Sequence, residues 1–278
     1  MEKYLAIIDL LTKIRDEKPL VHHITNYVTV NDCANITLAI GASPVMADDI
    51  NEVEEMVSIA SSLVLNLGTL NERTILSMLA AGKKANDLNI PIVLDPVGVG
   101  ATSYRTETAK RLIKELNISV IKGNISEIST LYGMNTRTKG VDAEESSDAP
   151  DNDTQNKIEI AEKLASNLNC IIAITGAIDI ITDGIKVYTI ENGDAIMSRI
   201  TGTGCMCTSL IGSFCAVSNN TLEGALAGVL SMGIAGEIAK DNVCINNKGT
   251  GSLKVEIMDC IYNLNKNIIV KKGKVYEK

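Results

Sequence analysis

Short apolar runs alternate along this chain with longer stretches of helical periodicity, and this alternation constrains the fold more than any other feature. Several of the apolar runs are apolar on both faces, which is typical of a mostly parallel sheet covered by helices on both sides. Strands are predicted at 63–67, 90–94, 118–121, 171–175 and 180–182, with 186–190 returning antiparallel. Helices are predicted at 71–89, 103–116, 205–217, 221–239 and 251–264. We therefore expect an α/β fold over residues 1–278 as a single domain, without a separate lid.

The composition excludes several classes of protein and partner. Apolar residues make up 45% of the chain, with one Phe and no Trp, so the core must be aliphatic. A formal net charge of −8 argues against nucleic acid or an anionic membrane surface as a partner. The first 19 residues predict a charged amphipathic helix rather than a signal peptide, and we expect no membrane-spanning segment. Seven cysteines without a C-x-x-C pair, and two histidines, speak against zinc or disulfides and favour a reducing cytoplasm.

Polar residues follow the predicted strands where each strand ends. They are Asn66 and Gly68, Asp95, the segment from Lys122 to Glu127, and Thr175 with Gly176. In a parallel sheet, ligands bind beyond the carboxyl ends of the strands. The sequence therefore predicts one ligand site at this edge of the sheet.

Two of these strand ends carry a carboxylate beside glycine. Asp95 precedes a glycine-rich loop and could bind Mg²⁺ directly or through water, or it could be a turn or helix-capping aspartate. Lys122 offers a phosphate a point charge, and Glu127 offers a second metal-side oxygen. Alternatively, Asn124 caps a helix with Glu127 as its capping-box partner, and both interpretations of Glu127 can hold together.

The segment 200–209, ITGTGCMCTS, predicts an anion site. Gly202 and Gly204 make a tight turn at the start of a helix, where free N–H groups and the helix dipole favour an anion such as phosphate. No Lys follows the last glycine, so the turn is not a Walker A loop, and a plain turn before a core helix is the alternative. A nucleophilic Cys205 would need a histidine base, which only His22 or His23 could supply. We regard that pair as structural or as the rim of a pocket.

Two further segments are less specific. Thr175-Gly176 and Thr182-Asp183-Gly184 could contact a nucleotide, or they could be ordinary turns. The stretch 139–153 carries six acidic residues with Ser and Pro, and it predicts a solvated acidic loop over about 138–155 without a catalytic role. Two carboxylates, a cation and a glycine anion site at one sheet edge suit metal-assisted phosphoryl transfer to a small molecule.

Seven segments, in order, resemble the hydroxyethylthiazole kinase family of the ribokinase-like superfamily. Between residues 21 and 205 they are VHHITNYVTVND, AIGASPVMADD, LVLNLGTL, LDPVGVGATSYR, IKGNISEI, ITGAIDIITDG and TGTGC. The resemblance implies transfer of the γ-phosphate of ATP to the primary alcohol of 4-methyl-5-(2-hydroxyethyl)thiazole, in thiamine salvage. It also implies a homotrimer with active sites between subunits.

The resemblance also implies roles for residues that match the family's motifs. Asn26, Met46 and Gly202 would bind the thiazole, Lys122 and Thr175 would bind ATP, and Asp95 and Glu127 would bind Mg²⁺. The backbone N–H groups from Gly202 through Gly204 to Cys205 would hold the transferring phosphoryl group, while Cys205 positions the alcohol and acts modestly as a base.

Two positions separate this chain from similar enzymes. Many members of the family have Arg where this chain has Lys122. Lysine keeps the positive charge but lacks the planar guanidinium group that can make bidentate hydrogen bonds. Most ribokinase-like enzymes have Asp at Cys205, which counts against a hydroxymethylpyrimidine kinase, a pyridoxal kinase or a hydrate dehydratase. A binding module without turnover is a further alternative. A dinucleotide-dependent oxidoreductase is disfavoured because no GxGxxG follows the first strand.

Overall fold

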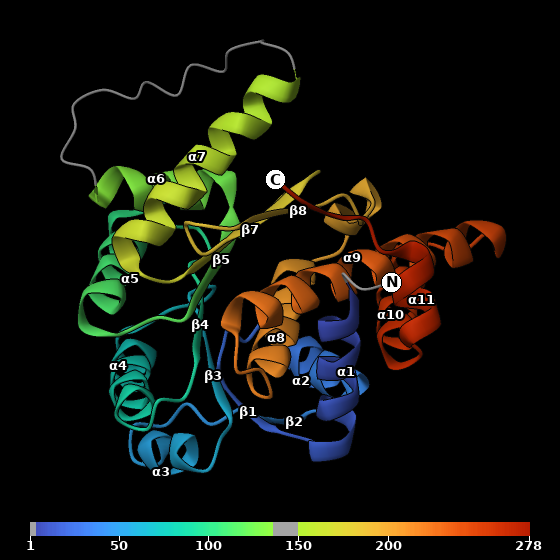
Figure 1. Ribbon diagram of the computed structural model, residues 1–278. Helices are drawn as coiled ribbons and strands as arrows, with labels where there is room; N and C mark the ends of the chain where they lie inside the picture. Colours follow the sequence, from blue (N-terminus) through green and yellow to red (C-terminus); the bar gives the residue numbers. More distant parts are fainter. Residues whose placement is uncertain (1–3, 136–149) are drawn as a thin grey trace.

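The computed structural model describes residues 4–135 and 150–278. Within them, nine strands form one sheet in the order β2-β1-β3-β4-β5-β6-β7-β8-β9 (Figure 1). The strands are β1 Leu20–Ile24, β2 Ser43–Val45, β3 Ser62–Asn66, β4 Ile92–Asp95, β5 Val120–Asn124, β6 Ile171–Thr175, β7 Asp179–Thr182, β8 Val187–Ile190 and β9 Val275–Glu277. Neighbours from β2 to β6 pair in parallel, and β6 to β9 pair antiparallel, so the predicted mostly parallel sheet is confirmed.

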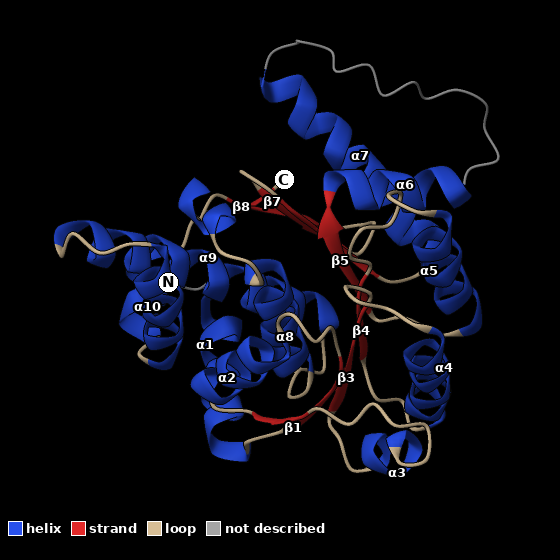
Figure 2. Ribbon diagram, turned by 180° about the vertical axis from the view of Figure 1, so that it is seen from behind, coloured by secondary structure: helices blue, strands red, loops and turns tan. Residues whose placement is uncertain are grey.

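Helices cover both faces of the sheet, as Figures 1 and 2 show. One face carries α1 Leu5–Glu17, α2 Val30–Ile40, α8 Thr203–Cys215, α9 Thr221–Ile245, α10 Thr250–Tyr262 and α11 Lys266–Lys272. The other carries α3 Val53–Ser58, α4 Glu72–Asp87, α5 Ser103–Glu115, α6 Ile125–Asn135 and α7 Pro150–Leu168. Each layer buries its own aliphatic cluster against the sheet, because the strands point apolar side chains to both faces.

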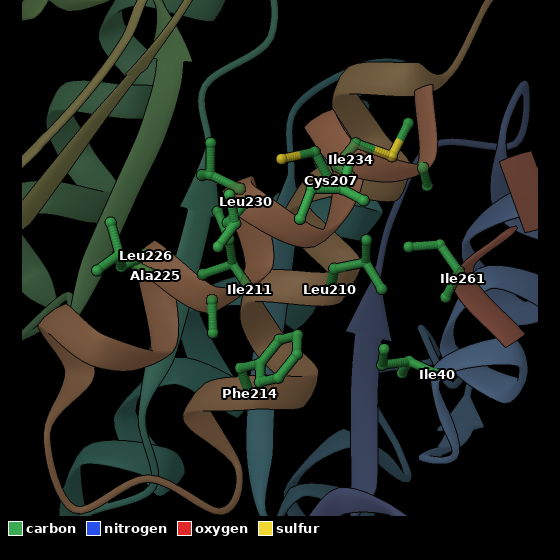
Figure 3. Packing of buried hydrophobic residues seen from close by; sticks show 14 of the residues in the cluster. Ile40, Cys207, Leu210, Ile211, Phe214, Ala225, Leu226, Leu230, Ile234 and Ile261 are labelled. Atoms are coloured by element: carbon green, nitrogen blue, oxygen red, sulfur yellow. The ribbon is translucent and has the colours of Figure 1, made fainter. Parts of the chain in front are cut away.

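α8 and α9 pack closely against each other. Phe214 on α8 is fully buried among aliphatic side chains of both helices, including Ile211 and Leu230 (Figure 3). A Cβ atom at Gly228 would lie 2.6 Å from the backbone nitrogen of Ile211, so only glycine permits this approach. By length and composition alone α9 could span a membrane, yet 83% of its most apolar window is buried inside the protein. The helix is apolar all round because it forms the centre of this layer.

The first two strands, β1 and β2, were not predicted from the sequence. β1 reads Leu-Val-His-His-Ile, and its two histidines interrupt the apolar pattern although both are almost fully buried. β2 has only three residues and includes Pro44, which an edge strand tolerates.

The predicted acidic loop is wrong at its end. α7 begins at Pro150, so the last residues assigned to the loop are helical, and proline suits the first position of a helix. The remainder of the predicted loop, residues 138–149, lies outside the described residues.

Candidate active site

The strand ends bring the predicted polar residues to one edge of the sheet. β3, β4, β5 and β6 are consecutive neighbours, and their register pairs Asn66 with Asp95 and Asn124 with Thr175. Parallel pairing forces this outcome, because strands that run in the same direction all end at the same side. The polar residues predicted from the sequence therefore meet at one edge of the sheet.

Two adjacent cavities open at this edge. The smaller has a volume of about 400 Å³ and is lined by Asn26, Asp95, Glu127, Gly202 and Cys205, among others. The larger, of about 580 Å³, is lined by Gly176, Asp179, Met197, Val229 and Met232, among others. Lys122, Thr175 and Gly204 line both cavities, so they mark the boundary between them.

The glycine turn has the geometry that the sequence indicated. Gly202 has φ +95°, in the left-handed region, and a Cβ atom there would lie 2.8 Å from Cγ2 of Thr29. No side chain caps α8, and its helical hydrogen bonds begin with the Met206 N–H donating to the Gly202 carbonyl. The first N–H groups therefore face the cavity boundary at the positive end of the helix dipole. This end of α8 can accept an anion.

Lys122 places a buried positive charge at the same boundary. Its side chain is 5% exposed, and Nζ lies 3.3 Å from the Gly204 carbonyl and 3.8 Å from Oδ2 of Asp95. Burial lowers the pKa of Lys122, but the charges around it, Asp95 foremost, outweigh that effect and raise the pKa above its usual value. The ammonium group therefore stays charged where a phosphate chain could pass from one cavity to the other.

Asp95 is held by hydrogen bonds to one of its two oxygens. Oδ2 accepts from Nδ2 of Asn66 at 3.0 Å and from Oγ1 of Thr208 at 2.6 Å. The hydrogen bonds found within the described residues leave Oδ1 available. The carboxylate is thus oriented and almost fully buried while it keeps one oxygen for a cation.

Glu127 combines a structural role with a place in the smaller cavity. Its Oε2 accepts from the Asn124 N–H at 2.9 Å, and Oδ1 of Asn124 accepts from the Glu127 N–H at 2.9 Å. This is the capping box that the sequence raised as an alternative, and it is confirmed. The other oxygen, Oε1, accepts from the Gly98 N–H at 2.8 Å, which ties α6 to the loop after β4.

Asp95 and Glu127 both line the smaller cavity, and carboxylate oxygens are ligands that suit a hard cation. Within the described residues, no group of three or more His, Cys, Asp or Glu side chains could hold a metal ion by itself. Mg²⁺ is usually bound by one or two carboxylates together with water and substrate phosphates, so Asp95 and Glu127 are a suitable donor set beside a phosphate site.

The sulfur of Cys205 lies in the smaller cavity and accepts hydrogen bonds from two amide side chains. The donors are Nδ2 of Asn26 at 3.4 Å and Nδ2 of Asn66 at 3.3 Å. His22 instead donates from Nε2 to the Ala47 carbonyl at 2.7 Å, and His23 donates from Nδ1 to the Val21 carbonyl at 3.1 Å. Both histidines are buried and neither lines the cavity that contains Cys205, so neither is placed there as its base.

Thr175, Met46 and the segment 182–184 were also singled out in the sequence, and they differ in their relation to the cavities. Thr175 donates a long hydrogen bond of 3.4 Å to the Gly123 carbonyl and lines both cavities. Met46 follows β2 and lines neither cavity within this chain. The segment 182–184 forms the turn between β7 and β8, in which Oγ1 of Thr182 accepts from the Gly184 N–H, so the turn interpretation is confirmed.

Three residues that were not predicted from the sequence support the site: Arg105, Thr208 and Thr29. Nη1 of Arg105 donates to the carbonyls of Leu67 and, at 2.7 Å, of Val97, while Nη2 donates to the Gly68 carbonyl at 2.6 Å. The guanidinium thus joins the loop after β3 to the loop after β4. The segment LDPVGVGATSYR contains this arginine, but nothing local in it indicates carbonyl partners about 40 residues earlier.

Over nearly its whole length, the chain is similar to known proteins of one family. The family model "Hydroxyethylthiazole kinase family" matches residues 11–267. The chain is 56% identical over 276 residues to the hydroxyethylthiazole kinase of Clostridium tetani, covering 99% of each chain, and 55% identical to that of Clostridium beijerinckii, covering 98% of each. Its structure is similar to that of the hydroxyethylthiazole kinase protein from Pyrococcus horikoshii, with a TM-score of 0.89, 37% identity and full coverage of both chains. This chain, with its ribokinase-like fold, belongs to the hydroxyethylthiazole kinase family.

Proposed function

We propose that this protein transfers the γ-phosphate of ATP to the primary alcohol of 4-methyl-5-(2-hydroxyethyl)thiazole, in thiamine salvage. One observation carries the proposal. The buried ammonium group of Lys122 and the uncapped N-terminus of α8 meet where two cavities join. Phosphoryl transfer depends on positioning and on neutralising the charge of the phosphate, and this junction supplies both.

The two cavities suit the two substrates. The larger, at about 580 Å³, has the size of a nucleotide site, and Lys122 with Thr175 would hold the phosphates at its inner end. The smaller, at about 400 Å³, would take the thiazole alcohol beside Asn26 and Gly202. The alcohol oxygen and the γ-phosphate would then approach each other at the N-terminus of α8.

Asp95 and Glu127 would bind Mg²⁺, which supplies positive charge to the phosphates when bound. The chain's own groups then do the remaining work. The N–H groups from Gly202 to Cys205 would hold the transferring phosphoryl group, and the sulfur of Cys205, fixed by two amides, would position the alcohol. A loose transition state needs little help from a base, which is consistent with a cysteine here.

We further propose a cytoplasmic homotrimer with active sites between subunits. Tyr27 and Val28 support an interface at the smaller cavity, because they are apolar and 77% and 55% exposed, and Val28 lines that cavity. A subunit interface would also allow Met46 to contact a thiazole, as its family motif implies, although it lines neither cavity of its own chain. Light scattering of the purified protein tests the trimer, and Val28→Asp should dissociate it.

The experiment that tests the activity is ADP release from ATP and Mg²⁺ with and without hydroxyethylthiazole. Hydroxymethylpyrimidine and pyridoxal serve as comparison alcohols. Thiazole-dependent release supports the proposal. Release with a comparison alcohol only would assign a different substrate to the same site, and no release with any alcohol would favour a binding module.

A further inference from the structure

The side-chain amide of Asn66 forms hydrogen bonds with three other side chains of the site, those of Asn26, Asp95 and Cys205. Its Oδ1 accepts from the backbone N–H of Gly68 at 2.9 Å and from Nδ2 of Asn26 at 2.9 Å. Because both partners are donors, they settle which end of the amide is oxygen. Its Nδ2 must therefore face Asp95 and Cys205, which offer acceptors at 3.0 Å and 3.3 Å.

The orientation of Asn26 is settled in the same way. Its Oδ1 accepts from both the backbone N–H and the hydroxyl of Thr29, each at 3.1 Å. Its Nδ2 therefore faces Asn66 and Cys205. The two amides are thus linked by a hydrogen bond. Flipping either one would break its hydrogen bond from a backbone N–H, that of Gly68 or that of Thr29.

The surroundings make Asn66 rigid. It is 2% exposed, so water does not compete for its amide. It ends β3 in register with Asp95 at the end of β4, and the next backbone N–H, of Leu67, donates to the Asp95 carbonyl at 3.0 Å. Asn66 is also absent from the lining of both cavities, so its side chain acts on other residues rather than on a ligand.

We infer that Asn66 is a positioning residue for phosphoryl transfer. Its NH₂ group donates to Oδ2 of Asp95 and to the sulfur of Cys205, and so sets the separation between the metal-side carboxylate and the group beside the acceptor alcohol. By occupying Oδ2 of Asp95 it also leaves Oδ1 for a cation. This inference rests on the function proposed above, and it predicts an effect on the chemical step rather than on nucleotide binding.

Asn66→Asp removes the donor group and adds a carboxylate opposite Asp95, while the aspartate keeps the shape and the oxygen that Gly68 and Asn26 use. The substitution turns the NH₂ donor into an acceptor opposite Asp95 and Cys205. We expect kcat for thiazole phosphorylation to fall at least about tenfold, the size of one lost hydrogen bond to a charged group. The KM for ATP should stay within about twofold, since no contact with the nucleotide cavity changes.

A double-mutant cycle tests whether Asn66 acts through Cys205. Asn66→Ala should lower kcat about tenfold in the wild-type background and less than about threefold in a Cys205→Ala background. This cycle also serves if Asn66→Asp does not fold because two carboxylates oppose each other. Thermal unfolding of each variant checks that the fold is retained.

Asn86→Asp is the matched control. Like that of Asn66, the Asn86 amide both donates and accepts: its Nδ2 donates to the Asn117 carbonyl at 2.9 Å and its Oδ1 accepts from the Asn117 N–H at 2.8 Å, and it lines neither cavity. Its kcat should equal that of the wild type. Wild-type kcat in Asn66→Asp, or an equal loss from Asn66→Ala in both backgrounds, overturns the inference. Absence of thiazole-dependent turnover in the wild type would instead overturn the proposed function.

Discussion

The hydroxyl of Thr208 donates a hydrogen bond to Oδ2 of Asp95 at 2.6 Å, across a sequence separation of 113 residues. Thr208 is on α8, two turns or less from the glycine turn, and Asp95 ends β4. The bond therefore couples the N-terminal part of α8, where we propose that phosphate binds, to the carboxylate that we propose as a metal ligand. Both side chains are almost completely buried, so this coupling is not weakened by water.

Thr208→Val should weaken both stability and turnover, because it removes a donor from a buried carboxylate while keeping the shape of the side chain. We expect the free energy of unfolding to fall by about 1–3 kcal/mol and kcat to fall with it. Thr37→Val is the control, since the buried Thr37 hydroxyl donates only to the Cys33 carbonyl of its own helix. Denaturant unfolding measures the change in stability, and steady-state kinetics measures the change in kcat. Equal effects from the two substitutions would contradict the role assigned to Thr208.

Gly202→Val should abolish turnover and leave most of the fold intact. The residue needs φ +95°, and its Cβ would lie 2.8 Å from the side chain of Thr29, so the turn must move away from the phosphoryl position. We expect kcat to fall at least about 100-fold, as for loss of a transition-state donor. Gly249→Ala, where a Cβ meets open space and φ is −102°, should retain activity. Retained activity in the Gly202 variant would refute this account of the turn.

Lys122→Met should raise the KM for ATP at least about tenfold, because it removes the buried cation between the cavities and leaves Asp95 without its positive neighbour. Nucleotide affinity can be measured by isothermal titration calorimetry as well as by kinetics. Lys186→Met removes an exposed cation after the β7 strand and should change neither quantity. Unchanged ATP affinity in the Lys122 variant would exclude it from phosphate binding.

Asp179→Asn should stabilise the protein at alkaline pH but not at acidic pH. Burial raises the pKa of Asp179 to about 7, and the Gly176 N–H and Lys122 lower it only in part. In the unfolded chain an aspartate titrates near pH 4, so wild-type stability contributed by this group falls as pH rises from about 4 to about 7.

Asparagine carries no charge at any of these pH values and keeps an acceptor for Gly176. The gain in unfolding free energy over the wild type should therefore grow with pH, reaching about 4 kcal/mol by pH 8. Denaturant unfolding at pH 5 and pH 8 measures it. A gain that is equal at both values would show that Asp179 is not protonated in the folded protein.

Most of the sheet could be predicted from the sequence because its central strands are continuous apolar runs. β6 was predicted residue for residue, since Ile171–Thr175 is apolar until its last residue. β1 could not, because His22 and His23 are polar residues that are buried by the tertiary packing, where His22 also donates to the Ala47 carbonyl. α9 was predicted too short, and its apolar surface on all sides makes sense only once α8 is seen to pack against its glycines.

The parts of the site that the sequence by itself determined are local. The glycine turn before α8 and the capping box of Asn124 with Glu127 involve residues within about one helical turn, so short-range backbone geometry specifies them. The tertiary structure decided how these pieces are joined. Asn66 reaches Cys205 across 139 residues, and Thr208 reaches Asp95 across 113. A hydrogen bond requires a separation of about 3 Å in space, and no pattern along the chain records which distant groups the packed sheet and helices bring that close.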